Sequence, residues 1–207
     1  MNINNFIRSE GWLYRFKHWH HIYSVIQQDK AASTPIEKLS EYRKELQENL
    51  KNYDLNDIYN CDKTALFWQL EPSKTLAYGE ISGTKQSKER ISIMLACNAM
   101  SDKLKLLVIH KHANSHAFKG IDKTNLPVYY YWNKKAWMQT SIFQNWIKKV
   151  NEIMRQQNKN IIMLLDNVSS HVVDNNTNLS NVKLHFFSSN TTAHLQSYDA
   201  GIIYSFK

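Results

Sequence analysis

The feature that most constrains the fold is an amphipathic helix pattern followed by a short apolar run that ends in an acid. From about Ser141 to Arg155, apolar residues recur every three or four positions, which predicts a helix with one buried face. Its apolar positions are Ile142, Phe143, Trp146, Ile147, Val150 and Met154. Gln144 lies three residues after Ser141, so these two side chains are expected to form a capping box. The run Ile161–Leu165 is too short for a core helix and suits a strand buried on both faces, and Asp166 ends it.

Short apolar runs separated by turns surround this helix and strand and predict a mixed sheet. The predicted strands are residues 58–62, 91–97, 104–109, 161–165 and 182–187, and an amphipathic piece begins near residue 195. This order of elements describes an α/β domain with helices packed on the sheet. Sites in such folds collect at the carboxyl ends of strands. Asp62 and Asp166 are expected at two such ends, with Asp199 projecting toward them from the closing helix.

Two helical segments are predicted before the sheet. Residues 1–30 are rich in aromatic and basic side chains, and Trp12, Phe16 and Trp19 fall on one helical face. This spacing suits a short helix resting on DNA, and it equally suits plain core packing. The second helix is predicted to be capped by residues 34–37. Its apolar positions are Leu39, Tyr42, Leu46 and Leu50.

The excess positive charge lies entirely in the sheet region. Residues 1–60 contain 8 Lys/Arg and 8 Asp/Glu, whereas residues 61–207 contain 18 and 10. Such a surface attracts a polyanion with salt-sensitive affinity, and it equally serves solubility. No apolar run approaches the roughly 20 residues that span a bilayer, so an intracellular protein without a membrane partner is expected. Cys61 and Cys97 lack the spacing of zinc ligands or of a disulfide framework and are expected to be buried free thiols.

Three short sequence words each place an aspartate at the edge of an apolar run. They read NCDKTALFW from Asn60, LLDNVSSH from Leu164 and HLQSYDAGII from His194. Between them lie PSKTLA from Pro72, GTKQSKER from Gly83 and NKKAWM from Asn133. With these words in this order, residues 58–206 resemble the DDE endonuclease domain of pogo-type (Tigger-like) transposases. Relatives of centromere protein B and jerky-like proteins belong to the same group.

The resemblance implies a ribonuclease-H-like fold and a catalytic, metal-binding triad of Asp62, Asp166 and Asp199. The second and third aspartates are separated by 32 residues, which is typical of that family. The implied cofactor is a pair of Mg²⁺ or Mn²⁺ ions, and the implied reaction is phosphodiester cleavage and strand transfer at transposon ends. Asn167 and His171 follow Asp166 closely enough to orient a ligand or a phosphate. The sequence is equally compatible with both being ordinary polar residues at the start of a helix.

The implied partner is double-stranded DNA, and the implied location is the nucleus; whether the chain forms a homodimer stays open. The residues expected at DNA are Arg15, Lys17, Lys85, Lys88, Arg90, Lys134 and Lys135. Residues 1–30 resemble a remnant of a helix-turn-helix DNA-binding domain, and residues 31–56 a helical linker. Residues 57–207 resemble the endonuclease domain, and the chain is expected to be truncated at both ends relative to the family.

Lys63 departs from the family pattern, because Glu usually follows the first aspartate. A cation beside two metal ions would compete with them. In a strand, however, neighbouring side chains point to opposite faces, so Lys63 is expected to face away from Asp62. Two functions stay open: a metal-dependent transposase-type endonuclease, and a catalytically inactive, transposon-derived nucleic-acid-binding protein. Both share fold and ancestry, so the sequence words do not separate them.

Overall fold

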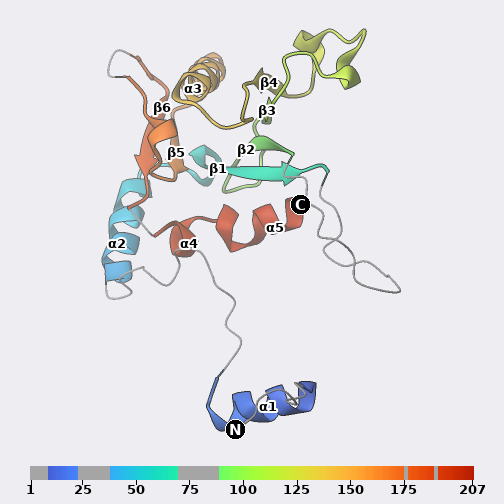
Figure 1. Cartoon of the computed structure of the whole chain (residues 1–207). Coiled ribbons are helices and arrows are strands. Elements are labelled where there is room, and N and C mark those ends of the chain that lie inside the picture. Colours follow the sequence, from blue (N-terminus) through green and yellow to red (C-terminus); the bar gives the residue numbers. More distant parts are fainter. Residues whose placement is uncertain (1–8, 23–37, 70–88, 175–176, 189–190) are drawn as a thin grey trace.

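A six-stranded mixed sheet forms the centre of the fold (Figure 1). The computed structural model describes residues 9–22, 38–69, 89–174, 177–188 and 191–207. The strands are β1 (Ile58–Phe67), β2 (Arg90–Asn98), β3 (Leu107–His110), β4 (Tyr129–Trp132), β5 (Ile161–Leu165) and β6 (Val182–Phe186). Their order in the sheet is β4-β3-β2-β1-β5-β6. β2 runs antiparallel to β1 and β3, whereas β1 with β5, β5 with β6 and β3 with β4 are parallel pairs.

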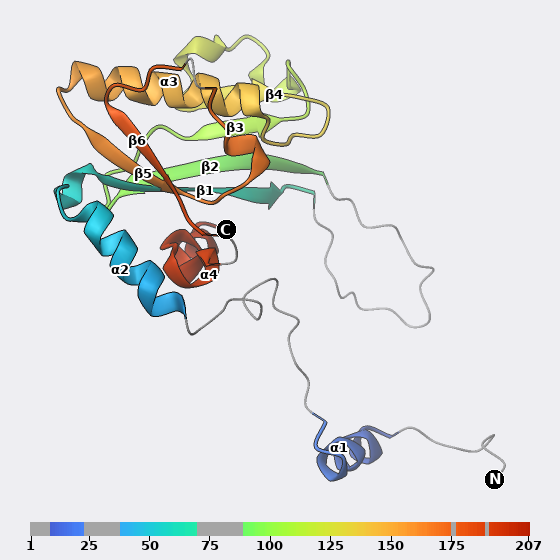
Figure 2. The same ribbon diagram turned by 90° about the vertical axis from the view of Figure 1, so that its left-hand side faces the viewer.

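Helices cover both faces of the sheet (Figure 2). One face carries α3 (Thr140–Gln156), and the other carries α2 (Leu39–Leu50) and the C-terminal segment. That segment comprises α4 (Thr192–Leu195), the helical turn η8 (Tyr198–Ile202) and α5 (Ile203–Phe206). The remaining elements are α1 (Glu10–Trp19) and the short helical turns η4 (Leu55–Asp57), η5 (His116–Phe118), η6 (Lys123–Asn125) and η7 (Ser169–His171). The predicted mixed sheet with flanking helices is confirmed.

The core on the first face is built around α3. Its buried residues are the six predicted from the sequence: Ile142, Phe143, Trp146, Ile147, Val150 and Met154. They pack with alternate residues of the central strands, including Cys61, Met94 and Met163. The predicted capping box is wrong, because α3 begins at Thr140 and its N-cap residue, Gln139, makes no side-chain capping bond. Ser141 therefore lies inside the first turn.

Alternate residues of the same strands build the core on the second face. Ile162 and Leu164 of β5 pack with Leu46 and Leu50, which belong to the predicted apolar face of α2. All five residues of β5 are buried, as expected for a strand with helices on both faces, so that prediction is confirmed. The cap predicted at residues 34–37 lies outside the described residues.

Three strand predictions differ from the structure. The strand predicted at residues 104–109 is β3, which begins only at Leu107 and ends at His110. β1 continues to Phe67, because its pairing with β2 extends from Tyr59 opposite Asn98 to Phe67 opposite Arg90. Asp62 therefore lies within a strand and not at its end, which corrects the prediction. β4 was not predicted, because its four residues are all aromatic and show no alternation of apolar and polar positions.

Both cysteines are free thiols, but only Cys61 is fully buried, whereas Cys97 is partly exposed. The expectation of two buried thiols is thus correct for Cys61 alone. Of the helices in the described part of the chain, none has the length and apolar character needed to cross a membrane.

Phe143 allows a test of the α3 core. Its side chain is fully buried between the helix and the sheet, so Phe143→Ala is expected to lower the free energy of unfolding by about 3–5 kcal/mol. Asn145→Ala, at an exposed position of the same helix, is expected to change it by less than about 0.5 kcal/mol. Denaturant unfolding measures both values, and equal effects would contradict this packing.

Candidate active site

The parallel pairing of β1 with β5 brings the first two aspartates of the sequence words together. Ile58, Tyr59 and Asn60 pair with Ile162, Met163 and Leu164. Two further steps along both chains reach Asp62 and Asp166, which therefore stand at the same level on neighbouring strands. Neighbouring strands lie about 4.8 Å apart, so the backbones of the two aspartates lie close together.

Asp62 is buried on the face of the sheet that carries the C-terminal segment. Cys61 points into the core beneath α3, and the alternation of a strand directs Asp62 to the opposite face. The side chain is 8% exposed, and its Oδ1 accepts a hydrogen bond of 2.6 Å from the backbone N–H of Lys63. Lys63 pairs with Met94, a residue of the α3 core, and its side chain is exposed. The expectation that Lys63 faces away from Asp62 is confirmed.

Asp166 follows β5 directly and contacts His171 of η7. His171 Nδ1 lies 2.8 Å from the carboxylate Oδ1 of Asp166 and 3.2 Å from its backbone oxygen. The imidazole is fully buried, and its ring lies 4.7 Å from the ring of Phe143. Packing against α3 therefore fixes the imidazole, and the imidazole limits where the carboxylate can turn. Asn167, next to Asp166, is exposed.

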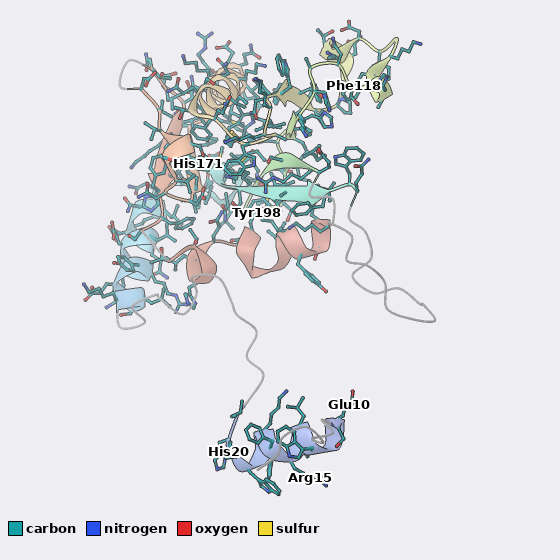
Figure 3. All side chains as sticks on the ribbon, viewed as in Figure 1. Glu10, Arg15, His20, Phe118, His171 and Tyr198 are labelled. Carbon is teal, nitrogen blue, oxygen red and sulfur yellow. The ribbon has the colours of Figure 1, made fainter. Side chains whose placement is uncertain are left out.

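The third sequence word lies against β1 on the Asp62 face. Gln196 is buried, and its Nε2 donates a hydrogen bond of 3.2 Å to the backbone oxygen of Cys61, the residue before Asp62. Tyr198 is also buried and packs with Ile93 and Leu95 of β2. Figure 3 shows His171 and Tyr198 on opposite sides of the sheet. Gln196 and Tyr198 thus hold the backbone that carries Asp199 beside the first aspartate.

Asp199 itself lies in η8, and its side chain is outside the described part of the structure. The segment kinks two residues later at Gly201, whose φ of 146° is unfavourable for a residue with a Cβ atom. The structure therefore places the backbone of this predicted ligand without giving the direction of its carboxylate.

The pKa values of two buried groups reflect the charge of these carboxylates. Burial raises the pKa of the Cys61 thiol well above its usual value, and the negative charges of Asp62 and Asp166 raise it further. Burial likewise raises the pKa of the Tyr198 phenol, with smaller contributions from Cys97, Cys61 and Asp62. Both groups therefore stay neutral near pH 7. Their neighbourhood gathers negative charge, which a bound cation would offset.

The donor set fits hard divalent cations. Carboxylate oxygens are the protein ligands that Mg²⁺ and Mn²⁺ prefer, and Asp62 and Asp166 offer them from adjacent strands. Among the described side chains, which exclude that of Asp199, no group of three His, Cys, Asp or Glu residues is arranged to hold a metal ion. The described site is therefore a pair of carboxylates, with the backbone of a third acidic residue close by.

Three of the residues predicted to contact DNA gather beside the carboxylates. Arg90, Lys134 and Lys135 line a cavity of about 430 Å³ together with Trp137. A second cavity of about 490 Å³ shares Arg90 and Trp137 and also includes Lys63. The residues just after Asp166, 168–170, line that second cavity. The structure therefore places a basic surface next to the loop that follows Asp166, on the face of β1 opposite Asp62.

The other residues predicted at DNA lie elsewhere. Arg15 and Lys17 are on α1, in which no described residue is buried, and Trp12 stacks on Phe16 within that helix at 4.9 Å. Figure 3 shows Arg15 on this helix. Lys85 and Lys88 lie outside the described residues.

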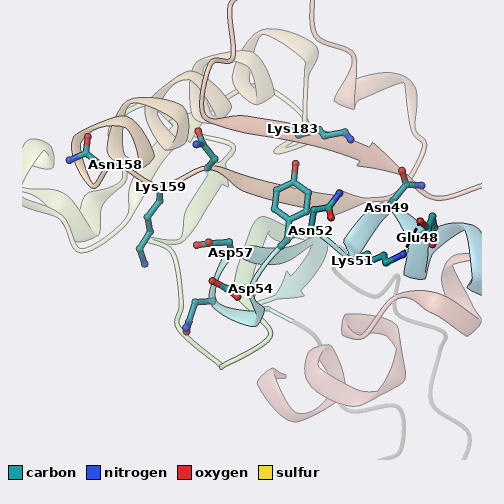
Figure 4. Close-up of a pocket in the computed structure, with 12 residues that line it drawn as sticks. Glu48, Asn49, Lys51, Asn52, Asp54, Asp57, Asn158, Lys159 and Lys183 are labelled. Carbon is teal, nitrogen blue, oxygen red and sulfur yellow. Dashed lines mark ion pairs between the residues drawn. The ribbon is translucent and has the colours of Figure 1, made fainter.

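A separate open cavity of about 960 Å³ lies at the opposite end of the parallel strands (Figure 4). It is lined by Asp57 before β1, Asn160 before β5 and Lys183 near the start of β6. Its lining mixes both charge signs, with Glu48 and Lys51 forming an ion pair of 3.5 Å. Size alone therefore does not mark the site, because this cavity is the larger one and lies away from the aspartates.

Sequence reasoning missed three residues that shape this region. Gln196 and Tyr198 act through tertiary contacts with β1 and β2 that no local pattern reveals. Trp137 is part of the motif NKKAWM, but its own role is not visible in the sequence. Its proximity to Arg90 and Lys111 depends on strands that are far apart in sequence.

Comparison with known proteins identifies relatives along nearly the whole chain. The profile of the DDE superfamily endonuclease family matches residues 88–207. "Tigger transposable element-derived protein 4" of Mus musculus is 33% identical over 208 residues, covering 99% of this chain and 40% of the relative. "Jerky protein homolog" of Homo sapiens is 30% identical, covering 94% and 37%. The chain thus spans about two fifths of the length of these curated relatives.

Among solved structures, the "Mos1 mariner paired end complex with Mn" aligns with a TM-score of 0.55. The alignment covers 96% of this chain and 56% of that chain at 12% sequence identity. At this identity the likeness concerns the fold alone. It confirms the expected ribonuclease-H-like fold of a mixed sheet flanked by helices.

Gln196 allows a test of how the third sequence word is held. Gln196→Leu removes the donor to the Cys61 backbone oxygen at a buried position, so the free energy of unfolding is expected to fall by about 1–3 kcal/mol. The matched control is Gln157→Leu, at an exposed position after α3, with an expected change below about 0.5 kcal/mol. A Gln196→Leu protein as stable as the wild type would show that this contact does not hold the segment.

Proposed function

Because this chain belongs to the DDE superfamily endonucleases of the pogo and Tigger type, we propose that it is a transposase-derived endonuclease that cleaves double-stranded DNA with divalent metal ions. The observation that carries the proposal is the shared level of Asp62 and Asp166 on the parallel strands β1 and β5. The hydrogen bond of Gln196 to β1 supports it, because it keeps the Asp199 segment at the same place.

Asp62, Asp166 and Asp199 would hold two Mg²⁺ or Mn²⁺ ions. A pair of such ions, when bound, activates a water molecule and stabilises the leaving 3′ oxygen of a phosphodiester. The Mos1 structure that shares this fold is a complex with Mn. Carboxylate oxygens, which are the donors found here, are ligands that this metal prefers. Strand transfer at transposon ends, in which a 3′ hydroxyl replaces water as nucleophile, belongs to the same proposal.

The chain's own residues orient the reacting groups. His171 positions the carboxylate of Asp166 through the 2.8 Å contact, and its burial against Phe143 keeps that contact in place. Asn167 is exposed beside Asp166, where its amide can contact a phosphate oxygen. Lys63, on the opposite face of β1 from Asp62, can pair with a phosphate without entering the carboxylate pair.

Double-stranded DNA is the proposed partner. Arg90, Lys134 and Lys135 would contact its backbone beside the site, and Arg15 and Lys17 would contact it from α1. Lys85 and Lys88 belong to the same proposed set by sequence. Nuclear residence follows from DNA as the substrate, and association of two copies into a homodimer remains part of the proposal.

The proposed domains follow the elements of the structure. Residues 57–207 form the endonuclease domain, which agrees with the start of β1 at Ile58. Residues 31–56 are the helical linker that contains α2, and residues 1–30 are the helix-turn-helix remnant that contains α1.

Nicking of supercoiled plasmid DNA tests the reaction. The wild-type chain is expected to nick the plasmid with Mn²⁺ or Mg²⁺, and Asp62→Asn and Asp166→Asn are expected to reduce nicking to the level without metal, because each removes a charged ligand. Asp54→Asn is the matched control, since Asp54 is exposed at the far end of β1 and its side chain makes no capping bond.

Nicking that survives both substitutions would rule out the proposed chemistry. DNA binding without metal-dependent nicking by the wild type would instead identify the chain as a catalytically inactive, transposon-derived nucleic-acid-binding protein.

His171→Gln tests the positioning of Asp166. The substitution removes the buried imidazole contact, so nicking is expected to fall about 10- to 100-fold and the Mn²⁺ concentration for half-maximal nicking to rise. A purely structural role would lower the amount of folded protein without shifting that concentration. His116→Gln, at an exposed position in η5, serves as the control.

Salt dependence tests the proposed DNA surface. The double substitution Lys134→Ala with Lys135→Ala is expected to reduce the slope of log affinity against log salt by about 1.8, because each phosphate contact contributes about 0.9. Lys51→Ala with Lys183→Ala removes the same charge at the opposite cavity and is expected to leave the slope nearly unchanged. Equal effects of both pairs would show that only net charge matters.

A further inference from the structure

An exposed tryptophan sits on a rigid turn beside the carboxylate site. We propose that Trp137 stacks an unpaired base of the DNA strand that passes the carboxylates, so that the site takes a locally single-stranded or frayed end of the duplex. This inference rests on the proposed function and specifies the state of the DNA that the site binds. The indole is 53% exposed.

The turn that carries Trp137 is built by side-chain hydrogen bonds. Asn133 Oδ1 accepts from the backbone N–H groups of Lys135 and Trp137 at 3.1 and 3.2 Å, and Asn133 Nδ2 donates to the Trp137 backbone oxygen at 2.6 Å. Ser92 Oγ on β2 donates to the Ala136 backbone oxygen at 2.6 Å. Hydrogen bonds therefore fix both ends of the turn, and the bond from Ser92 attaches it to the sheet.

The backbone of this turn is also strained. Ala136 has a φ of 50°, in the left-handed region that residues with a Cβ atom rarely occupy, and its side chain is buried. Strain of this kind persists only where surrounding contacts enforce it, and it gathers at binding sites. Here the enforced conformation presents a large apolar ring to solvent in a fixed direction.

Positive charge surrounds the ring. The Arg90 guanidinium carbon lies 5.0 Å from the ring centroid, and Lys135 Nζ lies 5.6 Å from it. Lys111 and Lys134 line the same cavity. An aromatic platform within a basic groove is the arrangement that binds single-stranded nucleic acid, because bases stack on the ring and phosphates pair with the cations.

The ring lines two cavities, one of which reaches the loop that follows Asp166. The cavity of about 490 Å³ is lined by Trp137, Arg90 and residues 168–170, just after Asp166, and by Lys63, which lies on the face of β1 opposite Asp62. The cavity of about 430 Å³ continues from Trp137 and Arg90 to Lys134 and Lys135. A strand whose phosphate lies at Asp166 can therefore continue past residues 168–170 and across Trp137.

The stacked base has to be unpaired. Bases in an intact duplex already stack on their neighbours and expose only their edges, so an indole gains a stacking partner only where the duplex has opened. A base entering the site replaces Arg90 or Lys135 over the ring. The displaced cation is then free to pair with the phosphate of the same nucleotide.

The test compares the affinity of the wild-type chain for two labelled duplexes of about 20 base pairs with a single-stranded overhang of about three nucleotides. One overhang carries bases, and the other is abasic, so both have the same phosphates. Binding is measured by fluorescence anisotropy in EDTA, and overhangs on the 3′ and on the 5′ end are both used. The wild type is expected to bind the base-bearing overhang of one polarity about 5- to 100-fold more tightly than its abasic counterpart.

Variants assign this preference to the ring. Trp137→Ala is expected to bind base-bearing and abasic overhangs equally, and Trp137→Phe, which keeps an aromatic face, to retain part of the preference. Trp132→Ala is the matched control, because Trp132 is 56% exposed at the end of β4 and lines neither of the two cavities. It is expected to retain the full preference.

Equal binding of both overhangs by the wild type would overturn the inference without need of any variant, and so would a preference that survives Trp137→Ala. If metal-dependent nicking requires Asp62 and Asp166 while the overhang preference is absent, the stacking inference falls and the endonuclease stands. A preference that depends on Trp137, found without any nicking, supports the stacking site and removes the proposed chemistry.

Discussion

The parallel pairing of β1 with β5 determines where the first two aspartates of the candidate site lie. Asp62 and Asp166 are separated by more than 100 residues, and only the alignment of Ile58 with Ile162 sets them level on adjacent strands. The pairing is stable because β5 is buried at every position between α3 on one face and α2 with the C-terminal segment on the other. A shift of one residue would exchange the β5 side chains that fill the two cores, which their close packing disfavours. The register that satisfies the two cores therefore also sets the spacing of the carboxylates.

The surroundings of these carboxylates follow from the same sheet. The alternation of β1 sends Cys61 into the α3 core and Asp62 to the face where Tyr198 packs. Gln196 then reaches the backbone between them, and this contact joins the end of the chain to its first strand. Because both neighbouring groups with raised pKa values stay neutral, the described negative charge near the site belongs to the aspartates. A bound cation would offset this charge, as the proposed metal-dependent reaction requires.

Charge of the opposite sign lies alongside and not within the carboxylate pair. Lys63 is the neighbour of Asp62 in sequence, yet the pleat of β1 directs it toward Arg90, Trp137 and the cavity beside η7. Lys63, which departs from the family pattern, therefore lies where it can pair with a backbone phosphate. Acidic and basic groups lie on two faces of this one strand, so the proposed cation and phosphate sites do not neutralise each other.

By itself, the sequence determined the mixed α/β class, the buried face of α3 and the buried strand β5, and it supplied the three candidate aspartates through the words around them. These features are local, because the period of apolar residues and the residues next to each acid can be read in one short window. Tertiary structure alone decided that β1 extends past Asp62, that four aromatic residues form β4, that Gln196 contacts β1, and that Arg90 lies over the ring of Trp137. Each of these depends on a partner far away in the chain: a strand is extended by the strand beside it, and a cluster forms only where the sheet brings its members together.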